Sequence, residues 1–100
     1  MAATPEAKVK AAVKKILDAE KVWHFAPASN GMGRAGIPDI ICCHNGRFLA
    51  IECKAGKGKT TALQDRELAA IEAAGGATIV VNEANLGLVQ EAIDYLRSYL

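Results

Sequence analysis

The chain has 100 residues, of which 51% are hydrophobic and 23% are charged, and its formal net charge is +1. This composition is typical of a single globular domain and excludes a disordered chain. No apolar run reaches the roughly 18 residues of a membrane span, and the chain lacks a secretory h-region, so we expect a cytoplasmic protein. The three cysteines form no CxxC pair, and we expect reduced thiols rather than structural zinc.

Positive charge is concentrated in the middle of the chain. Residues 31–60 hold five cations and two anions, a net +3, whereas the other residues hold seven cations and nine anions, a net −2. A locally basic, glycine-rich segment suits contact with phosphate groups, although a solvated loop has the same composition. The candidate phosphate contacts are Arg34, Arg47, Lys57 and Lys59.

The N-terminal part of the chain predicts a helix, a short strand and a loop. Residues 4–21 form the helix, with Thr4 as its N-cap, and its apolar stripe consists of Val9, Val13, Ile16 and Leu17. Residues 22–27 are mostly β-branched or aromatic and predict the strand. Residues 28–36 form a glycine-rich loop.

Two apolar runs, residues 37–43 and 48–54, predict a β-hairpin. Asn45-Gly46 lies between them and is typical of a type I′ turn. Pairing through this turn places Asp39 directly opposite Glu52 on the neighbouring strand. Directly opposed side chains lie about 5 Å apart at Cβ, where two like charges destabilise a sheet.

The C-terminal part of the chain predicts a helix, a strand and a second helix. Residues 61–74 form the first helix, which a capping box of Thr61 and Gln64 begins. Residues 77–82 are almost wholly apolar, so we expect a central strand. Residues 86–100 form the last helix, whose inward positions are Leu86, Val89, Ile93 and Leu96. The order αβββαβα predicts an α/β fold with helices covering a sheet.

The predicted hairpin brings a third charge to the two opposed carboxylates. Lys54 lies two residues beyond Glu52 and therefore projects from the same face of its strand. A divalent cation such as Mg²⁺ would stabilise this cluster, because Mg²⁺ binds one or two carboxylates together with water and phosphate oxygens. The alternative is an ion pair between Glu52 and Lys54 at the end of a strand, with Asp39 marking a turn.

Pro38-Asp39, followed after twelve residues by Glu52-Cys53-Lys54, resembles the PD-(D/E)XK signature of metal-dependent nucleases. With the segments GRAGIPDI and IECKAGKGK and with Gln64, the pattern is similar to the VRR-NUC family, the virus-type replication-repair nucleases. The resemblance spans nearly the whole chain and implies one nuclease domain over residues 1–100. It also implies a restriction-endonuclease-like αβββαβα core with a mixed sheet.

The resemblance implies roles for individual residues. Asp39 and Glu52 would bind Mg²⁺ or Mn²⁺ with the backbone carbonyl of Cys53, and Lys54 would position or activate the attacking water. Glu6 matches the acidic residue of the family's first helix that approaches the metal, although it would also complement the helix dipole. Gln64 matches a glutamine that follows the catalytic lysine, and the capping box is its local explanation.

The implied activity is a structure-selective DNA endonuclease that cuts branched, Holliday-junction-like DNA in a bacterial or phage-infected cell. The resemblance also implies a homodimer and no nucleotide cofactor. The dimer interface would lie on the first helix or on the last, which carries Tyr95, Tyr99 and Leu100. The alternatives are a non-catalytic nucleic-acid-binding module with the same fold and an oligomerising scaffold.

Other candidate sites are weaker. The segment GKGKT lacks the upstream glycine of a P-loop, because Cys53 occupies that position. His24 is expected to be a half-buried histidine of a strand, and His44 a turn residue or minor phosphate contact. Cys42 and Cys43 point to opposite faces of an apolar strand, where a thiol stays protonated and unreactive.

Overall fold

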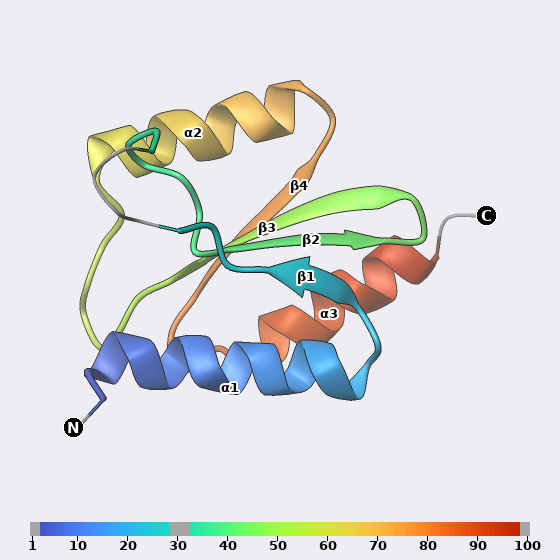
Figure 1. Ribbon diagram of the computed structural model, residues 1–100, viewed down its shortest axis with the longest axis horizontal. Coiled ribbons are helices and arrows are strands. Elements are labelled where there is room, and N and C mark those ends of the chain that lie inside the picture. Colours follow the sequence, from blue (N-terminus) through green and yellow to red (C-terminus); the bar gives the residue numbers. More distant parts are fainter. Residues whose placement is uncertain (1–2, 29–32, 99–100) are drawn as a thin grey trace.

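The computed structural model describes residues 3–28 and 33–98, which form a four-stranded mixed sheet between two helical layers (Figure 1). The predicted order αβββαβα is confirmed. Within the described ranges, no helix is long and apolar enough to cross a membrane. The elements are α1 (Pro5–Ala19), β1 (Trp23–Phe25), β2 (Ile40–His44), β3 (Arg47–Cys53), α2 (Ala62–Ala73), β4 (Ala77–Val81) and α3 (Gly87–Arg97).

The predicted caps of the first two helices are confirmed. The hydroxyl of Thr4 accepts a hydrogen bond of 3.0 Å from the backbone N–H of Ala7 and begins α1. At the start of α2, the N–H of Gln64 donates to the Thr61 hydroxyl at 3.2 Å, and the Thr61 N–H donates to Gln64 Oε1 at 2.9 Å. Each cap satisfies N–H groups that the first helical turn leaves without a partner.

The strand register is the one that the turn predicts. Strand β2 is antiparallel to β3, and the ladder pairs Ile40 with Ile51 and His44 with Arg47. Asn45 and Gly46 both have positive φ angles, 53° and 73°, as a type I′ turn requires. The ladder ends at Ile40 and Ile51, and Asp39 is the residue immediately before β2.

The expectation that the strand at residues 77–82 is central is wrong, because the sheet order β1-β2-β3-β4 places β4 at an edge. Strand β4 pairs only with β3 and runs parallel to it. A parallel partner needs a crossover connection, here α2, and the hairpin already occupies the other side of β3. The strand is nevertheless apolar because α2 and α3 contact its two faces.

One face of the sheet is fully covered. Helices α1 and α3 pack on it side by side, whereas α2 lies on the other face (Figure 1). Alternate residues of β2 and β3 point into the covered face, where they meet apolar stripes from both helices. The buried members of this core are Val9, Val13, Leu17, Val22, Ile40, Cys42, Leu49, Ile51, Cys53, Val81, Val89, Ile93 and Leu96.

The α2 face is only partly covered. Helix α2 packs over β4, so the β1 and β2 side of this face lacks a helical cover in the described structure (Figure 1). The residues of β3 that alternate with the core positions, Phe48, Ala50 and Glu52, point to this side. Glu52 therefore lies on the α2 face, whereas Arg47 at the turn has the strand parity of Leu49 and Ile51 on the closed face.

Candidate catalytic site

Four of the predicted site residues meet at the open end of the hairpin. Glu52 Oε2 accepts a hydrogen bond of 2.8 Å from Gln64 Nε2 and lies 3.6 Å from Lys54 Nζ. Asp39 Oδ2 accepts a hydrogen bond of 2.8 Å from the backbone N–H of Cys53, so its carboxylate is held beside the end of β3. The arrangement joins two acids, one ammonium and one amide from β3, α2 and the segment before β2.

The electrostatics of this cluster favour the addition of positive charge. Glu52 is only 1% exposed. Burial and then the neighbouring charge of Asp39 raise the pKa of Glu52 to about 7, although the ammonium of Lys54 acts in the opposite direction. Ionisation of this buried acid costs free energy, and the nearby carboxylate of Asp39 increases the cost. A bound cation would stabilise the ionised form.

A close backbone contact fixes Asp39 relative to α2. Gly36 has a φ of 82°, and a Cβ at this position would lie 2.5 Å from the carbonyl oxygen of Leu63. Only glycine allows this approach between the segment before β2 and the first turn of α2. That first turn also carries Gln64. The contact therefore fixes Asp39 and Gln64, which both lie beside the Glu52 carboxylate, relative to each other.

A second tether between the same two segments was not predicted from the sequence. The guanidinium of Arg34 forms an ion pair with Glu67 of α2, and its Nη2 lies 3.2 Å from Glu67 Oε2. Glu67 is buried, whereas the Arg34 side chain is 72% exposed. The helical spacing of Gln64, Glu67 and Leu68 is the signal that places Glu67 on the inward side of α2.

Glu6 does not join the two carboxylates. It lies in the first turn of α1, which packs on the opposite face of the sheet. Within residues 3–28 and 33–98, no group of three or more histidine, cysteine, aspartate or glutamate side chains is close enough to hold a metal ion. An Asp39–Glu52 pair completed by the Cys53 carbonyl needs no third side chain of this kind.

The predicted phosphate contacts lie at different distances from the cluster. Lys57 and Lys59 are exposed in the loop directly after Lys54, and this loop is braced by a 2.6 Å hydrogen bond from the Gly56 N–H to Glu83. Arg47 lies at the turn, at the opposite end of β3 from Glu52. Part of the predicted loop at residues 28–36 falls outside the described residues, as do Tyr99 and Leu100.

The two histidines are bonded to residues outside the carboxylate cluster. His24 Nε2 lies 2.8 Å from Asp18 Oδ1, and His44 Nε2 accepts a hydrogen bond of 3.1 Å from Arg97 Nε. The cysteines are free thiols, and burial raises the pKa of both Cys42 and Cys53 to about 12. These thiols stay protonated at neutral pH and are poor nucleophiles.

Comparisons with known proteins agree that this chain is similar to nucleases. Residues 11–82 match the family model described as archaeal Holliday junction resolvase (Hjc). The chain is also 36% identical over 80 residues to "Putative nuclease p44" of Acyrthosiphon pisum secondary endosymbiont phage 1, a match that covers 79% of this chain and 86% of that protein.

Two solved structures share the fold. One is described as "VRR_NUC domain", with a TM-score of 0.72, 23% identity, and coverage of 93% of this chain and 98% of that chain. The other, "VRR_NUC domain protein", has a TM-score of 0.68, 17% identity, and coverage of 100% and 91%. The predicted restriction-endonuclease-like fold and the resemblance to VRR-NUC nucleases are confirmed.

Proposed function

Because the chain belongs to the family of archaeal Holliday junction resolvases, we propose that it is a Mg²⁺- or Mn²⁺-dependent endonuclease that cuts branched DNA. The observation that carries the proposal is the convergence of Asp39 and Glu52 beside Lys54 on the α2 face of the sheet. These residues and Gln64 all lie within the matched segment, residues 11–82. The activity would be that of a single domain in the cytoplasm of a bacterial or phage-infected cell.

The donor atoms at the site fit a hard divalent cation. Asp39 and Glu52 offer carboxylate oxygens, and the Cys53 carbonyl would be a third oxygen ligand, which is the donor type that Mg²⁺ and Mn²⁺ prefer. The raised pKa of Glu52 adds a reason for cation binding, because a cation offsets the cost of keeping that buried acid ionised. When bound, the metal would polarise the scissile phosphodiester and stabilise charge on its oxygens.

Lys54 would act on the attacking water. Its ammonium lies 3.6 Å from Glu52 Oε2 and its side chain is 12% exposed, so it is held at the cluster instead of extending into solvent. From this position it would orient the water by hydrogen bonding and take up or hold a proton at Nζ. Gln64 would keep Glu52 in place through the hydrogen bond from its side-chain amide.

The DNA backbone would lie along the rim of the site. Lys57 and Lys59 follow the catalytic strand directly and would contact phosphates next to the cut, and Arg34 would contact the strand from the other side. Arg47, at the hairpin turn, would reach only a distant part of the substrate. Glu6 would approach the metal from the start of α1 when DNA is bound.

Branched DNA and a homodimer are the finer parts of the proposal. Phosphate contacts carry no sequence information, so preference would come from the shape of the substrate. A junction has two strands to cut, and a small domain with one site would cut both by acting as two copies.

The test is a cleavage assay on labelled four-way junction, flap and linear duplex, with Mg²⁺ or with EDTA. We expect Asp39→Asn and Lys54→Ala to lower the rate by at least about 100-fold without unfolding the protein. Glu91→Gln, an exposed acid of α3, is the matched control and should cut like the wild type. Cleavage that persists in EDTA, or that is unchanged in both site variants, would contradict the proposal, and binding without cleavage would favour the non-catalytic module.

A further inference from the structure

Two turns lie side by side where β3 and β4 leave the sheet. The two strands are parallel, so they leave it at the same end, and the last backbone bond between them runs from the Lys54 N–H to the Val81 carbonyl at 2.9 Å. Residues 55–58 form the turn after β3, and residues 82–85 form the turn after β4. The first turn follows Lys54 directly, so any group that fixes this turn acts next to the catalytic cluster.

The turn after β4 is held in place by its own side chains. The N–H of Asn85 donates to the Asn82 carbonyl at 3.2 Å and closes the turn. Asn82 Oδ1 accepts a hydrogen bond of 2.8 Å from the Ala84 N–H, and Asn85 Oδ1 accepts one of 2.6 Å from the Asn82 N–H. Such side-chain bonds fix the backbone where no strand ladder continues. The side chain of Glu83 therefore starts from a fixed point of the backbone.

The turn after β3 carries two of the predicted phosphate contacts but has little rigidity of its own. The Gly58 N–H donates to the Ala55 carbonyl at 2.9 Å, and Gly56 has a positive φ of 55° at the first central position, which suits glycine. Lys57 occupies the second central position and is exposed, as is Lys59. A segment with glycine at alternate positions has many accessible conformations, so an outside contact is needed to keep its lysines in place.

That contact comes from the turn after β4. The Gly56 N–H donates to Glu83 Oε1 at 2.6 Å, and Asn82 Nδ2 lies 3.5 Å from the Gly56 carbonyl oxygen. A hydrogen bond to a carboxylate is stronger than one between two neutral groups. The two side chains hold both backbone polar groups of Gly56, and they thereby set the direction of the chain that leads to Lys57.

Glu83 is an unexpected residue at this place if DNA lies along the same rim. Its side chain is exposed, and a carboxylate next to a phosphate backbone opposes binding. A hydrogen bond at such an exposed position also adds little to the stability of the fold. What the geometry of this acid does provide is a fixed turn beside the catalytic cluster.

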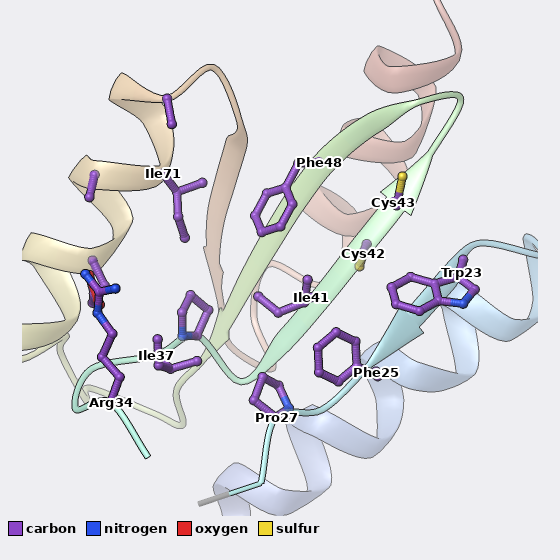
Figure 2. Close-up of a pocket in the computed structure, with 14 residues that line it drawn as sticks. Trp23, Phe25, Pro27, Arg34, Ile37, Ile41, Cys42, Cys43, Phe48 and Ile71 are labelled. Carbon is purple, nitrogen blue, oxygen red and sulfur yellow. The ribbon is translucent and has the colours of Figure 1, made fainter.

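Neither of the other predicted cations lies on this turn. Figure 2 shows the Arg34 side chain beside α2, where its guanidinium pairs with Glu67. Arg47 lies at the hairpin turn, at the end of β3 opposite to the catalytic cluster. Contact with the phosphates next to the cut would therefore depend most on Lys57 and Lys59.

We propose that Glu83 is a positioning residue, which with Asn82 fixes the turn after β3 so that Lys57 and Lys59 face the phosphates beside the metal pair. The proposal rests on the proposed function for DNA as the ligand. Glu83 would touch neither the metal nor the substrate. Its effect would be to order the lysines before DNA binds, so that less conformational freedom is lost on binding.

The first experiment measures steady-state cleavage of a labelled four-way junction in Mg²⁺. We expect Glu83→Ala to raise KM about 10-fold and to leave kcat within about 2-fold of the wild type, because Lys54 and Glu52 keep their own contacts. Glu83→Gln keeps an acceptor oxygen and should restore the wild-type KM. Glu91→Ala removes an exposed acid of α3 and is the matched control. An unchanged KM in Glu83→Ala, or a fall in kcat that Glu83→Gln shares, would overturn the proposal.

A double-mutant cycle tests whether Glu83 acts through the lysines. In a protein that already carries Lys57→Ala and Lys59→Ala, Glu83→Ala should raise KM by less than about 2-fold, because no lysine is left to position. A further rise of about 10-fold would show that Glu83 acts on DNA through another group, and it would contradict the positioning role.

A third measurement needs neither metal nor cleavage. In the protein without DNA, hydrogen exchange of the Gly56 amide should be at least about 10-fold faster in Glu83→Ala than in the wild type or in Glu83→Gln. The dissociation constant for the same junction in EDTA should rise about 10-fold in Glu83→Ala. Equal exchange rates in the wild type and Glu83→Ala would show that the bond to Gly56 does not hold the turn, and the proposal would be wrong.

These readouts separate the position of the turn from the chemistry of the site. A protein that binds the junction with this dependence on Glu83 but cuts no DNA would leave the positioning role standing and remove the nuclease proposal. A protein that cuts DNA in Mg²⁺, while its KM and its Gly56 exchange rate do not respond to Glu83→Ala, would do the reverse.

Discussion

The two faces of the sheet differ in what they bury, although the same strands build both. The face under α1 and α3 is a closed apolar core in which Leu49, Ile51 and their neighbours are inaccessible to solvent. The face under α2 buries a glutamate at one end of the hairpin and leaves aromatic rings exposed beyond it. Both departures from ordinary burial lie on the same face.

The difference teaches where stability and activity reside. The period of two along β3 sends Ile51 to the closed face and the next residue, Glu52, to the other. The closed face supplies the free energy that lets the second face keep a buried acid with a raised pKa. Substitutions on the closed face should therefore mainly lower stability, whereas substitutions of the acids on the α2 face should mainly lower activity.

The largest effect on stability is expected on the closed face. Ile51→Ala would remove buried methyl groups from a fully packed position and lower the free energy of unfolding by about 2–5 kcal/mol. Val80→Ala, on neighbouring β4 and 39% exposed, should cost less than about 1 kcal/mol. Urea unfolding measures both. Equal losses would show that the two faces do not differ in the way their burial indicates.

The next effect is a pH dependence of stability on the α2 face. The pKa of Glu52 is raised from 4.5 to about 7 in the folded protein, so the folded state binds this proton more tightly than the unfolded state. Without metal, the free energy of unfolding should therefore fall as pH rises from about 4.5 to about 7, by on the order of 2 kcal/mol. Glu52→Gln carries no such charge and should lose this part of the pH dependence.

The next measurement concerns the same carboxyl group, Glu52, and compares melting temperatures with and without Mg²⁺. Protons compete with a cation for the carboxylate, so Mg²⁺ should raise the melting temperature more at pH 8 than at pH 5.5. Glu52→Gln should show little rise at either pH. A wild-type curve that is flat from pH 4.5 to pH 7 in EDTA, or that slopes upward, would show that this carboxyl is not held in a costly ionised state.

The sequence predicted the carboxylate pair because the determinants of the hairpin are local. Asn45 and Gly46 adopt the left-handed conformations of a type I′ turn, and the strand period then fixes every pair along the ladder. Asp39 and Glu52 follow from that register. Lys54 follows from strand alternation. The capping box predicts only that Gln64 begins α2, and its place beside Glu52 was implied by the resemblance to VRR-NUC nucleases.

Features that depend on tertiary packing were not predictable. The edge position of β4 depends on the order of the sheet, because the pairing of β2 with β3 leaves only the outer side of β3 for the strand that follows α2. The pairing of Arg34 with Glu67 joins residues 33 positions apart, and one of them lies in a loop without periodicity. Trp23 and Phe25 are exposed because α2 covers only part of the sheet. The sequence pattern of this strand would be the same if a helix covered the rings, so it could not predict their exposure.

The smallest effect concerns the two roles of Gln64, which the structure combines in one side chain. Its Oε1 accepts from the Thr61 N–H in the capping box, and its Nε2 donates to Glu52. Gln64→Ala would remove both hydrogen bonds and should lower the free energy of unfolding by about 1–2 kcal/mol. Thr61→Ala would weaken only the cap, at a cost of about 1 kcal/mol, and should leave the dependence of cleavage on pH unchanged.

Gln64→Glu separates the roles, because a carboxylate still accepts from Thr61 but cannot donate to Glu52 when ionised. It also adds a negative charge beside Glu52, which would raise the pKa of that acid further. We expect the free energy of unfolding at pH 7 to fall by about 1 kcal/mol, because the hydrogen bond to Glu52 is lost. We also expect slower cleavage at pH 7, with recovery at higher pH, measured as rate against pH at fixed Mg²⁺. If Gln64 serves only as a cap, the rate of cleavage by Gln64→Glu will depend on pH as in the wild type. The hydrogen bond to Glu52 would then contribute nothing to cleavage.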